Sequence, residues 1–247
     1  MIATGGKTIY GAKIGMLLLE SRFPRVRGDG GNARTWPFPM LYEVVPKATP
    51  SRIVRDDPRE LLPEFLAAAR RLVAMGADGI TTNCGFLVLL QNELANACDV
   101  PVASSSLLQV PWVQSLLPSS KKVGILTISE GTLTHAHLRA AGVAEDTPIG
   151  GTEHGEEFYR VIINDEDRLD VPRAAEDILR AGRALCEAHP NIGAIVLECT
   201  NMGPYTSHLS AALGIPVYDF YSFVSWFHTG LSPRRFVSAV IADPSST

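Results

Sequence analysis

The stretch Ala77-Asp78-Gly79-Ile80-Thr81-Thr82-Asn83-Cys84 returns in altered form as Ile192-Gly193-Ala194-Ile195-Val196-Leu197-Glu198-Cys199. A Pro-Val pair follows each cysteine at the same spacing, Pro101-Val102 after Cys84 and Pro216-Val217 after Cys199. Two landmarks that repeat at one spacing indicate an internal duplication. The chain therefore consists of two related halves, and each half carries one thiol at the same place.

Each half is predicted to be an α/β lobe. The segments 13–18 and 122–127 resemble each other and are short apolar runs, typical of strands that are covered on both faces. Apolar residues recur at helical spacing in the segments 58–75 and 171–188. Alternating strands and helices predict two pseudo-symmetric, doubly wound parallel-sheet lobes, with the active site in the cleft between them.

We place the first lobe at residues 1–118 and the second at 119–216. The C-terminal segment, about 217–247, is a candidate to pack back onto the first lobe. A length of 247 residues is ample for two such lobes.

Composition and charge favour a small-molecule partner. The formal net charge is -4 and the signs are scattered, so no basic stripe for nucleic acid is present in the sequence. The apolar stretch Ile14–Leu19 is too short for a signal core, and we expect no membrane association and a cytoplasmic location. The sequence does not fix the oligomeric state, although Trp36, Trp112 and Trp226 could furnish the apolar surface of a homo-oligomer.

The four cysteines fall into two groups. No Cys-x-x-Cys pair and no histidine at zinc-ligand spacing occurs, so we predict neither a metal site nor a cofactor. Cys98 and Cys186 lie toward the ends of predicted helices and are expected to serve packing. Cys84 and Cys199 each follow a strand and precede a helix, where open α/β sheets place their ligands.

Two thiols that face each other across a cleft are suited to proton transfer. One thiolate removes a proton from one face of a carbon, and the opposite thiol delivers a proton to the other face. We expect the N-terminus of the following helix to lower the pKa of each cysteine toward neutrality. Asn83, beside Cys84, and Thr200 and Asn201, beside Cys199, add hydrogen-bond donors for a substrate.

The motif Thr82-Asn83-Cys84-Gly85-Phe86 and the motif Leu197-Glu198-Cys199-Thr200-Asn201-Met202 resemble the cofactor-independent aspartate/glutamate racemase superfamily. That superfamily includes hydantoin racemases, maleate isomerases and arylmalonate decarboxylases. The resemblance implies that Cys84 and Cys199 are the paired acid/base catalysts. It also implies that Thr200 and Asn201 bind the substrate.

The departures from the racemase motifs bear on the substrate. Gly85 and Phe86 stand where glutamate and aspartate racemases have Asn-Thr, and Glu198 and Asn201 replace a Gly and a His. The pattern is nearer to the hydantoin-racemase branch. Decarboxylase members keep only the second cysteine, whereas this chain keeps both. The resemblance thus favours an isomerase, a racemase or epimerase of amino acids or their derivatives.

The predicted activity is that of a cofactor-independent racemase or isomerase acting on a small carboxylate, amino-acid or hydantoin-type substrate. Its predicted binding residues are Asn83, Gly85, Phe86, Thr127, Ser129, Thr200 and Asn201. Thr127 and Ser129 end a strand of the second half, and solvent-facing turn residues are the alternative for them. Glu198 is expected to point the other way along its strand.

Two other function classes stay open. A single-cysteine decarboxylase, maleate-type isomerase or hydrolase would use one thiol alone. A two-lobed small-molecule binding protein would leave both thiols inert. The 22–38 loop, with its Gly28–Asn32 stretch, lacks the spacing of a nucleotide-binding loop and is interpreted as a lid or a turn-rich connection.

Overall fold

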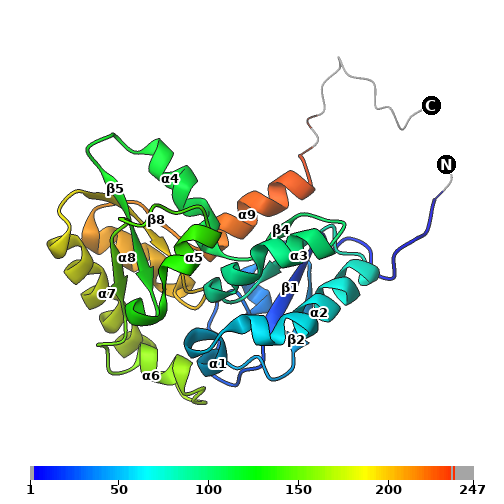
Figure 1. Cartoon of the computed structure of the whole chain (residues 1–247), viewed down its shortest axis with the longest axis horizontal. Coiled ribbons are helices and arrows are strands. Elements are labelled where there is room, and N and C mark those ends of the chain that lie inside the picture. The colour runs from blue at the N-terminus through cyan, green and yellow to red at the C-terminus, as the bar shows by residue number, and fades with distance from the viewer. Residues whose placement is uncertain (1–2, 235, 237–247) are drawn as a thin grey trace.

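Two four-stranded parallel sheets form the framework of the protein. The structure is a computed structural model that describes residues 3–234 and 236. The strand orders are β2-β1-β3-β4 in the first lobe and β6-β5-β7-β8 in the second, so the two sheets have the same connectivity. Figure 1 shows the two lobes side by side, with helices around each sheet. The predicted fold class, a duplicated α/β architecture, is confirmed.

The strands of the first lobe are β1 (Ile14–Leu19), β2 (Met40–Val45), β3 (Gly79–Thr82) and β4 (Val102–Ala103). Those of the second lobe are β5 (Lys122–Thr127), β6 (Ile149–Gly151), β7 (Ile192–Leu197) and β8 (Val217–Tyr218). The central strands are almost wholly buried because helices cover both faces of a parallel sheet. This burial explains the apolar sequences of β1 and β7, whereas β3 ends in two buried threonines, Thr81 and Thr82.

The helices of the first lobe are α1 (Pro50–Arg55), α2 (Leu62–Met75), α3 (Gln91–Ala97) and α4 (Val110–Leu116). The second lobe contributes α5 (His135–Ala140), α6 (Phe158–Ile163), α7 (Val171–Ala188) and α8 (Thr206–Leu213), and α9 (Phe220–Leu231) follows it. The predicted helix over 171–188 coincides with α7. The predicted helix over 58–75 begins as a separate 3-10 turn, Pro58–Leu61, and Pro63 then lies in the first turn of α2, where its missing N–H costs nothing.

Helix α9 packs against the sheet of the first lobe, although β8, which precedes it, belongs to the second. Phe220, Phe223 and Val224 of α9 form a buried cluster with Ile14 and Met16 of β1. In Figure 1, α9 lies between the two lobes. The lobe boundaries at residues 118 and 216 stay a prediction.

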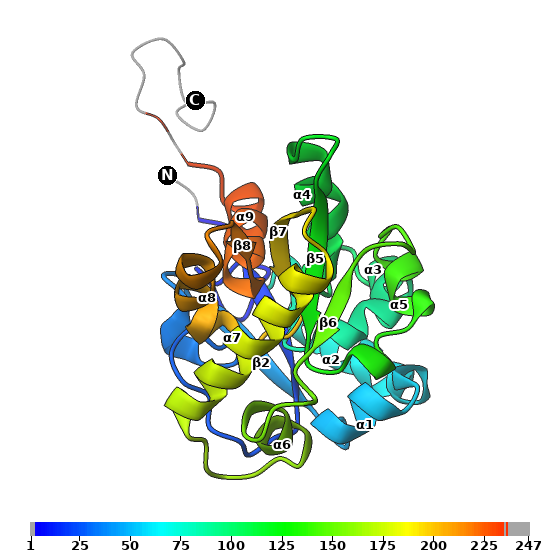
Figure 2. The ribbon, with the colours of Figure 1, turned by 90° about the vertical axis from the view of Figure 1, so that its left-hand side faces the viewer.

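The lobes also meet at the opposite side of the cleft. Helix α6 of the second lobe contacts α1 of the first, and Figure 2 shows these two short helices close together. This contact and the α9 packing bring the carboxyl ends of the two sheets toward a common space. No helix within residues 3–234 is long and apolar enough to cross a membrane.

Candidate active site

Cys84 and Cys199 line one pocket between the lobes. Each lies two residues beyond the end of a central strand, β3 for Cys84 and β7 for Cys199. The pocket is narrow, with a cavity volume of about 20 Å³, which is room for little more than a water molecule. Apolar residues from both lobes close it: Leu19, Phe23, Pro50, Val54, Phe86, Ile128 and Ile162.

Five further predicted binding residues also line this pocket: Asn83, Gly85, Phe86, Thr200 and Asn201. Thr127 and Ser129 do not line it. Side chains alternate between the two sides of an extended strand, so Ile128 faces the pocket and its two neighbours face away. Thr127 instead supports the site from behind, since its hydroxyl donates to Oε2 of Glu198 at 2.8 Å.

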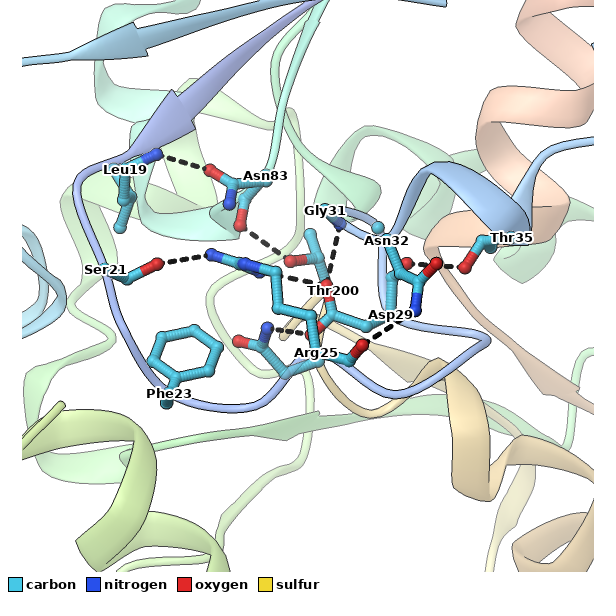
Figure 3. A network of polar contacts seen from close by, with 12 residues as sticks. Leu19, Ser21, Phe23, Arg25, Asp29, Gly31, Asn32, Thr35, Asn83 and Thr200 are labelled. Atoms are coloured by element: carbon cyan, nitrogen blue, oxygen red, sulfur yellow. Dashed lines mark hydrogen bonds and ion pairs between the residues drawn. The ribbon is translucent and has the colours of Figure 1, made fainter. Parts of the chain in front are cut away.

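A hydrogen bond between the lobes ties the two motif loops together. The Thr200 hydroxyl donates to the backbone oxygen of Asn83 at 2.6 Å, and both residues are buried. Figure 3 shows this bond at the centre of a larger polar network. Because Asn83 and Thr200 adjoin Cys84 and Cys199, the bond holds the backbones that carry the two thiols in register.

Glu198 is a third ionisable group of the site, and the sequence analysis placed it wrongly. Its side chain is 1% exposed and lines the same pocket as the two thiols. Besides the Thr127 hydroxyl, the N–H groups of Ile128 and Gly85 donate to its carboxylate. The strand ends at Leu197, so the period-2 alternation used for the prediction no longer applies at residue 198.

Gly85 and Glu198 are matched to each other. A Cβ at residue 85 would overlap Oε1 of Glu198, so only glycine fits beside that carboxylate. Gly85 in the first copy of the motif and Glu198 in the second are therefore in direct contact and depend on each other. The Glu198 carboxylate takes the space into which a side chain at residue 85 would project.

Burial makes the thiolate forms of both cysteines unfavourable. Burial raises the pKa of Cys84 to about 12, with a further contribution from the negative charge of Glu198. Burial likewise raises the pKa of Cys199 well above its ordinary value, again with Glu198 adding to the effect. Burial raises the pKa of Glu198 itself to about 7, against its ordinary 4.5.

The expected lowering of both thiol pKa values by helix N-termini is thus wrong. A 3-10 turn follows each cysteine, Gly85–Leu90 after Cys84 and Gly203–Tyr205 after Cys199, and each turn continues directly into a helix, α3 or α8. The N–H groups of Phe86 and Leu87 do lower the pKa of Cys84, but their effect is smaller than that of burial. The loss of hydration on burial therefore outweighs the donors that this segment offers to the sulfur.

Arg25 is a second residue that the sequence analysis missed. It lines the pocket, and its guanidinium donates to Asp29 at 2.9 Å and to Ser21 at 2.8 Å. The guanidinium also lies 4.5 Å from the centre of the Phe23 ring. Figure 3 shows Arg25 among these partners. Arg25 lies in the loop after the first strand, where a ligand-binding residue can be expected. The loop is long and has no regular spacing of residues, so its contacts could not be predicted from the sequence.

Asn83 presents an unused hydrogen-bond donor. Its Oδ1 accepts from the Leu19 N–H at 2.8 Å, and this bond fixes which end of the amide faces the strand. Its Nδ2 is buried and has no partner in the described part of the chain. A buried donor without a partner costs about 1–3 kcal/mol, so this atom is suited to an acceptor group of a bound ligand.

The other two cysteines do not line the pocket. Cys98 and Cys186 are half-buried and pack against the main hydrophobic core. Within residues 3–234 and 236, no cluster of three or more His, Cys, Asp or Glu side chains is arranged to hold a metal ion.

Solved structures show which proteins share this fold. Allantoin racemase from Klebsiella pneumoniae superimposes with a TM-score of 0.62 at 20% identity, covering 89% of this chain and 87% of the racemase. Arylmalonate decarboxylase superimposes with a TM-score of 0.61 at 15% identity, over 89% and 92% of the two chains. Glutamate racemase of Bacillus anthracis gives 0.60 at 15%, over 89% and 83%. The chain therefore has the fold of the Asp/Glu racemase superfamily, as its two motifs predicted.

The relatives found by sequence are named as lyases, not as racemases or decarboxylases. A dimethylsulfoniopropionate lyase of Durusdinium sp. clade D is 28% identical over 222 residues, which cover 84% of this chain and 71% of the lyase. Dimethylsulfoniopropionate lyase 7 of Emiliania huxleyi is 28% identical over 217 residues, or 83% of this chain. The match spans 63% of that lyase, less than two thirds of its length. No family model matches the chain.

Replacing Glu198 by glutamine is expected to change how stability depends on pH. The folded-state pKa of about 7 lies above the ordinary 4.5, so the contribution of this carboxyl is fully present below pH 4.5 and is lost as the pH rises through 7. The loss is on the order of 3 kcal/mol, from about 1.4 kcal/mol for each unit of pKa difference. Glu198→Gln removes the titration, so its stability relative to wild type should improve between pH 5 and pH 8.

Urea unfolding of both proteins at the two pH values measures this difference. Glu176→Gln, at an exposed position of α7, is the matched control and should show no such change. A stability difference between Glu198→Gln and wild type that is the same at pH 5 and pH 8 would show that Glu198 does not titrate in this range.

Proposed function

We propose that this protein is a cofactor-independent lyase that removes a proton from the carbon beside the carboxylate of a small substrate. A thiol of the pocket, in its thiolate form, accepts that proton. The electron pair of the C–H bond becomes a C=C bond, and a leaving group departs from the next carbon with its own bonding pair. In dimethylsulfoniopropionate the leaving group is dimethyl sulfide, and the remaining product is acrylate.

The observation that carries this proposal is the placement of Cys84 and Cys199 on one narrow pocket. A carbon acid held there contacts a proton acceptor without needing a metal or an organic cofactor. Asn83 Nδ2 and the Arg25 guanidinium supply a donor and a positive charge on the same pocket, which suits a substrate carboxylate. The narrowness of the pocket favours a short substrate over a bulky one.

The hydrogen bonds and charges around the two thiols differ, and this difference favours elimination over racemisation. Cys84 receives the N–H groups of Phe86 and Leu87 and the positive charge of Arg25, all of which stabilise its thiolate. The Cys199 thiol donates to Oδ1 of Asn201 at 3.4 Å, a bond that requires the proton to stay on sulfur. A racemase must exchange the two roles between its forward and reverse reactions, whereas an elimination needs one base only. The names of the sequence relatives point in the same direction.

Racemisation or epimerisation is the second candidate, and the retention of both cysteines on the pocket supports it. The fold shared with allantoin racemase is consistent with either reaction. Both candidates begin with loss of the same proton. They differ in whether a leaving group is available and in whether Cys199 then gives its proton to the opposite face.

The reaction is tested with purified protein, dimethylsulfoniopropionate and a panel of chiral hydantoins and amino acids in D₂O. Proton NMR follows acrylate formation and exchange of deuterium at the carbon beside the carboxylate. We expect elimination from the sulfonium substrate and a loss of roughly 10²–10⁴-fold in kcat for Cys84→Ser, the usual contribution of one acid/base group. Cys98→Ser is the control, because that thiol does not line the pocket.

Racemisation of a panel member without elimination would replace the lyase proposal by the second candidate. Neither elimination nor deuterium exchange in any compound would reject both. Full activity in Cys84→Ser would reject the role of this thiol as the base.

The carboxylate role of Asn83 is tested by Asn83→Asp. An aspartate keeps the oxygen that accepts from the Leu19 N–H but removes the Nδ2 donor and adds a negative charge. Hydrogen bonds to charged groups contribute about 1.5–3 kcal/mol, so KM should rise by at least about 10-fold. Asn92→Asp, at an exposed position of α3, is the charge-matched control. An unchanged KM in steady-state kinetics would place the carboxylate elsewhere.

A further inference from the structure

The 22–38 loop joins the site through a buried carboxylate. This loop connects β1 to β2, and Asp29 lies in its Gly28–Asn32 stretch with 2% of its surface exposed. Figure 3 shows Asp29 inside the polar network beside Arg25 and Thr200. The sequence predicts a lid or a turn-rich connection here, and in the proposed reaction Arg25 is the residue of this loop that contacts the substrate.

Both oxygens of Asp29 are committed. Its Oδ1 accepts from the Arg25 guanidinium at 2.9 Å and from the Gly31 N–H at 2.7 Å. Its Oδ2 accepts from Nδ2 of Asn201 at 2.6 Å. An ionised carboxylate can only accept hydrogen bonds, so Asn201 must turn its NH₂ group toward Asp29.

The orientation of the Asn201 amide determines whether its oxygen or its NH₂ group faces the sulfur of Cys199. With the NH₂ group on Asp29, the amide oxygen faces the sulfur, and the Cys199 thiol donates to it at 3.4 Å. A thiolate in the same place would face the lone pairs of that oxygen. The reverse orientation of the amide would present N–H groups to the sulfur and would stabilise the thiolate instead.

We propose that Asp29 is a positioning residue that, through Asn201, keeps the proton on Cys199 and so makes Cys84 the base of the site. The inference rests on the proposed function for the identity of the base, but the state of Cys199 is independent of any turnover. Cys84 accepts the substrate proton as an S–H bond forms and the C–H bond breaks. Cys199 neither gains nor loses a proton in the elimination.

The charged and titratable groups around Cys199, like the oxygen of the Asn201 amide, favour the protonated form of its thiol. Glu198 from the end of β7, Cys84 from the first lobe and Asp29 from the loop all raise the pKa of this thiol when they are ionised. The N–H of Asn201 opposes them, and burial has the largest effect. Arg25 is paired with Asp29, and its positive charge acts on Cys84.

Asp29→Asn gives a sharp test because the new side chain has nearly the same shape. The Arg25 guanidinium and the Gly31 N–H both require an oxygen at the Oδ1 position, so the new NH₂ group must take the Oδ2 position. Asn201 then has to turn its oxygen toward residue 29 and its NH₂ group toward Cys199. The proposal therefore predicts a lower pKa for the Cys199 thiol in Asp29→Asn.

The measurement is the rate of iodoacetamide alkylation of Cys199 against pH, followed by mass spectrometry. The background is the variant Cys84→Ser/Cys98→Ser/Cys186→Ser, which leaves this thiol as the single one. We expect the alkylation midpoint of Asp29→Asn to fall by at least about one pH unit, within the range that hydrogen-bond and charge changes produce. Asn32→Ala is the control, since Asn32 holds the same loop by donating to the Arg25 backbone oxygen at 2.7 Å and does not contact Asn201.

Asn201→Ala provides a second variant if the loop does not tolerate Asp29→Asn. It removes the oxygen acceptor but leaves the bonds of Asp29 to Arg25 and Gly31 in place, and its midpoint should also fall. Midpoints equal to that of the background in both variants would overturn the proposal, as would an equal fall in Asn32→Ala. Inactivity of the wild-type protein toward every substrate would reject the proposed function and leave this titration unaffected.

Discussion

The gathering of several ionisable acidic groups around one buried pocket is the physical constraint on which the rest of this site depends. Two thiols and the Glu198 carboxylate line the same small space, and Asp29 lies buried directly behind it. Among the described residues that line the pocket, Arg25 is the cationic one, and Asp29 already engages it. Like charges in a poorly solvated site cannot all be ionised together, so proton occupancy must be divided among these groups.

The hydrogen bonds of the site determine how that division falls. Donors converge on Cys84 and on the Glu198 carboxylate, while an acceptor is held against Cys199. The two thiols therefore stand in unequal surroundings. The duplication produced two equivalent cysteine positions, but the 22–38 loop, which has no counterpart bonded in this way to the first motif among the described residues, makes the pair asymmetric.

The sequence predicted the framework better than the electrostatics. The repeat located β3, β7, Cys84 and Cys199, because strand burial and backbone spacing leave a periodic trace. Arg25, Asp29 and the orientation of Glu198 were missed, since their contacts join segments far apart in the chain and no local spacing encodes them. The low thiol pKa values were wrong for a related reason, as burial depends on packing that a motif does not record. The racemase motifs also correctly indicated the superfamily fold, but the reaction depends on which groups surround the thiols.

Chemical cross-linking can establish whether Cys84 and Cys199 face one common space. The variant Cys98→Ser/Cys186→Ser retains only these two thiols, and a small bis-electrophilic reagent is then added under native conditions at alkaline pH. Peptide mass spectrometry reads the products. We expect one reagent molecule to join the peptides of Cys84 and Cys199. Two separately modified cysteines without the joined product would show that the two thiols do not share one space.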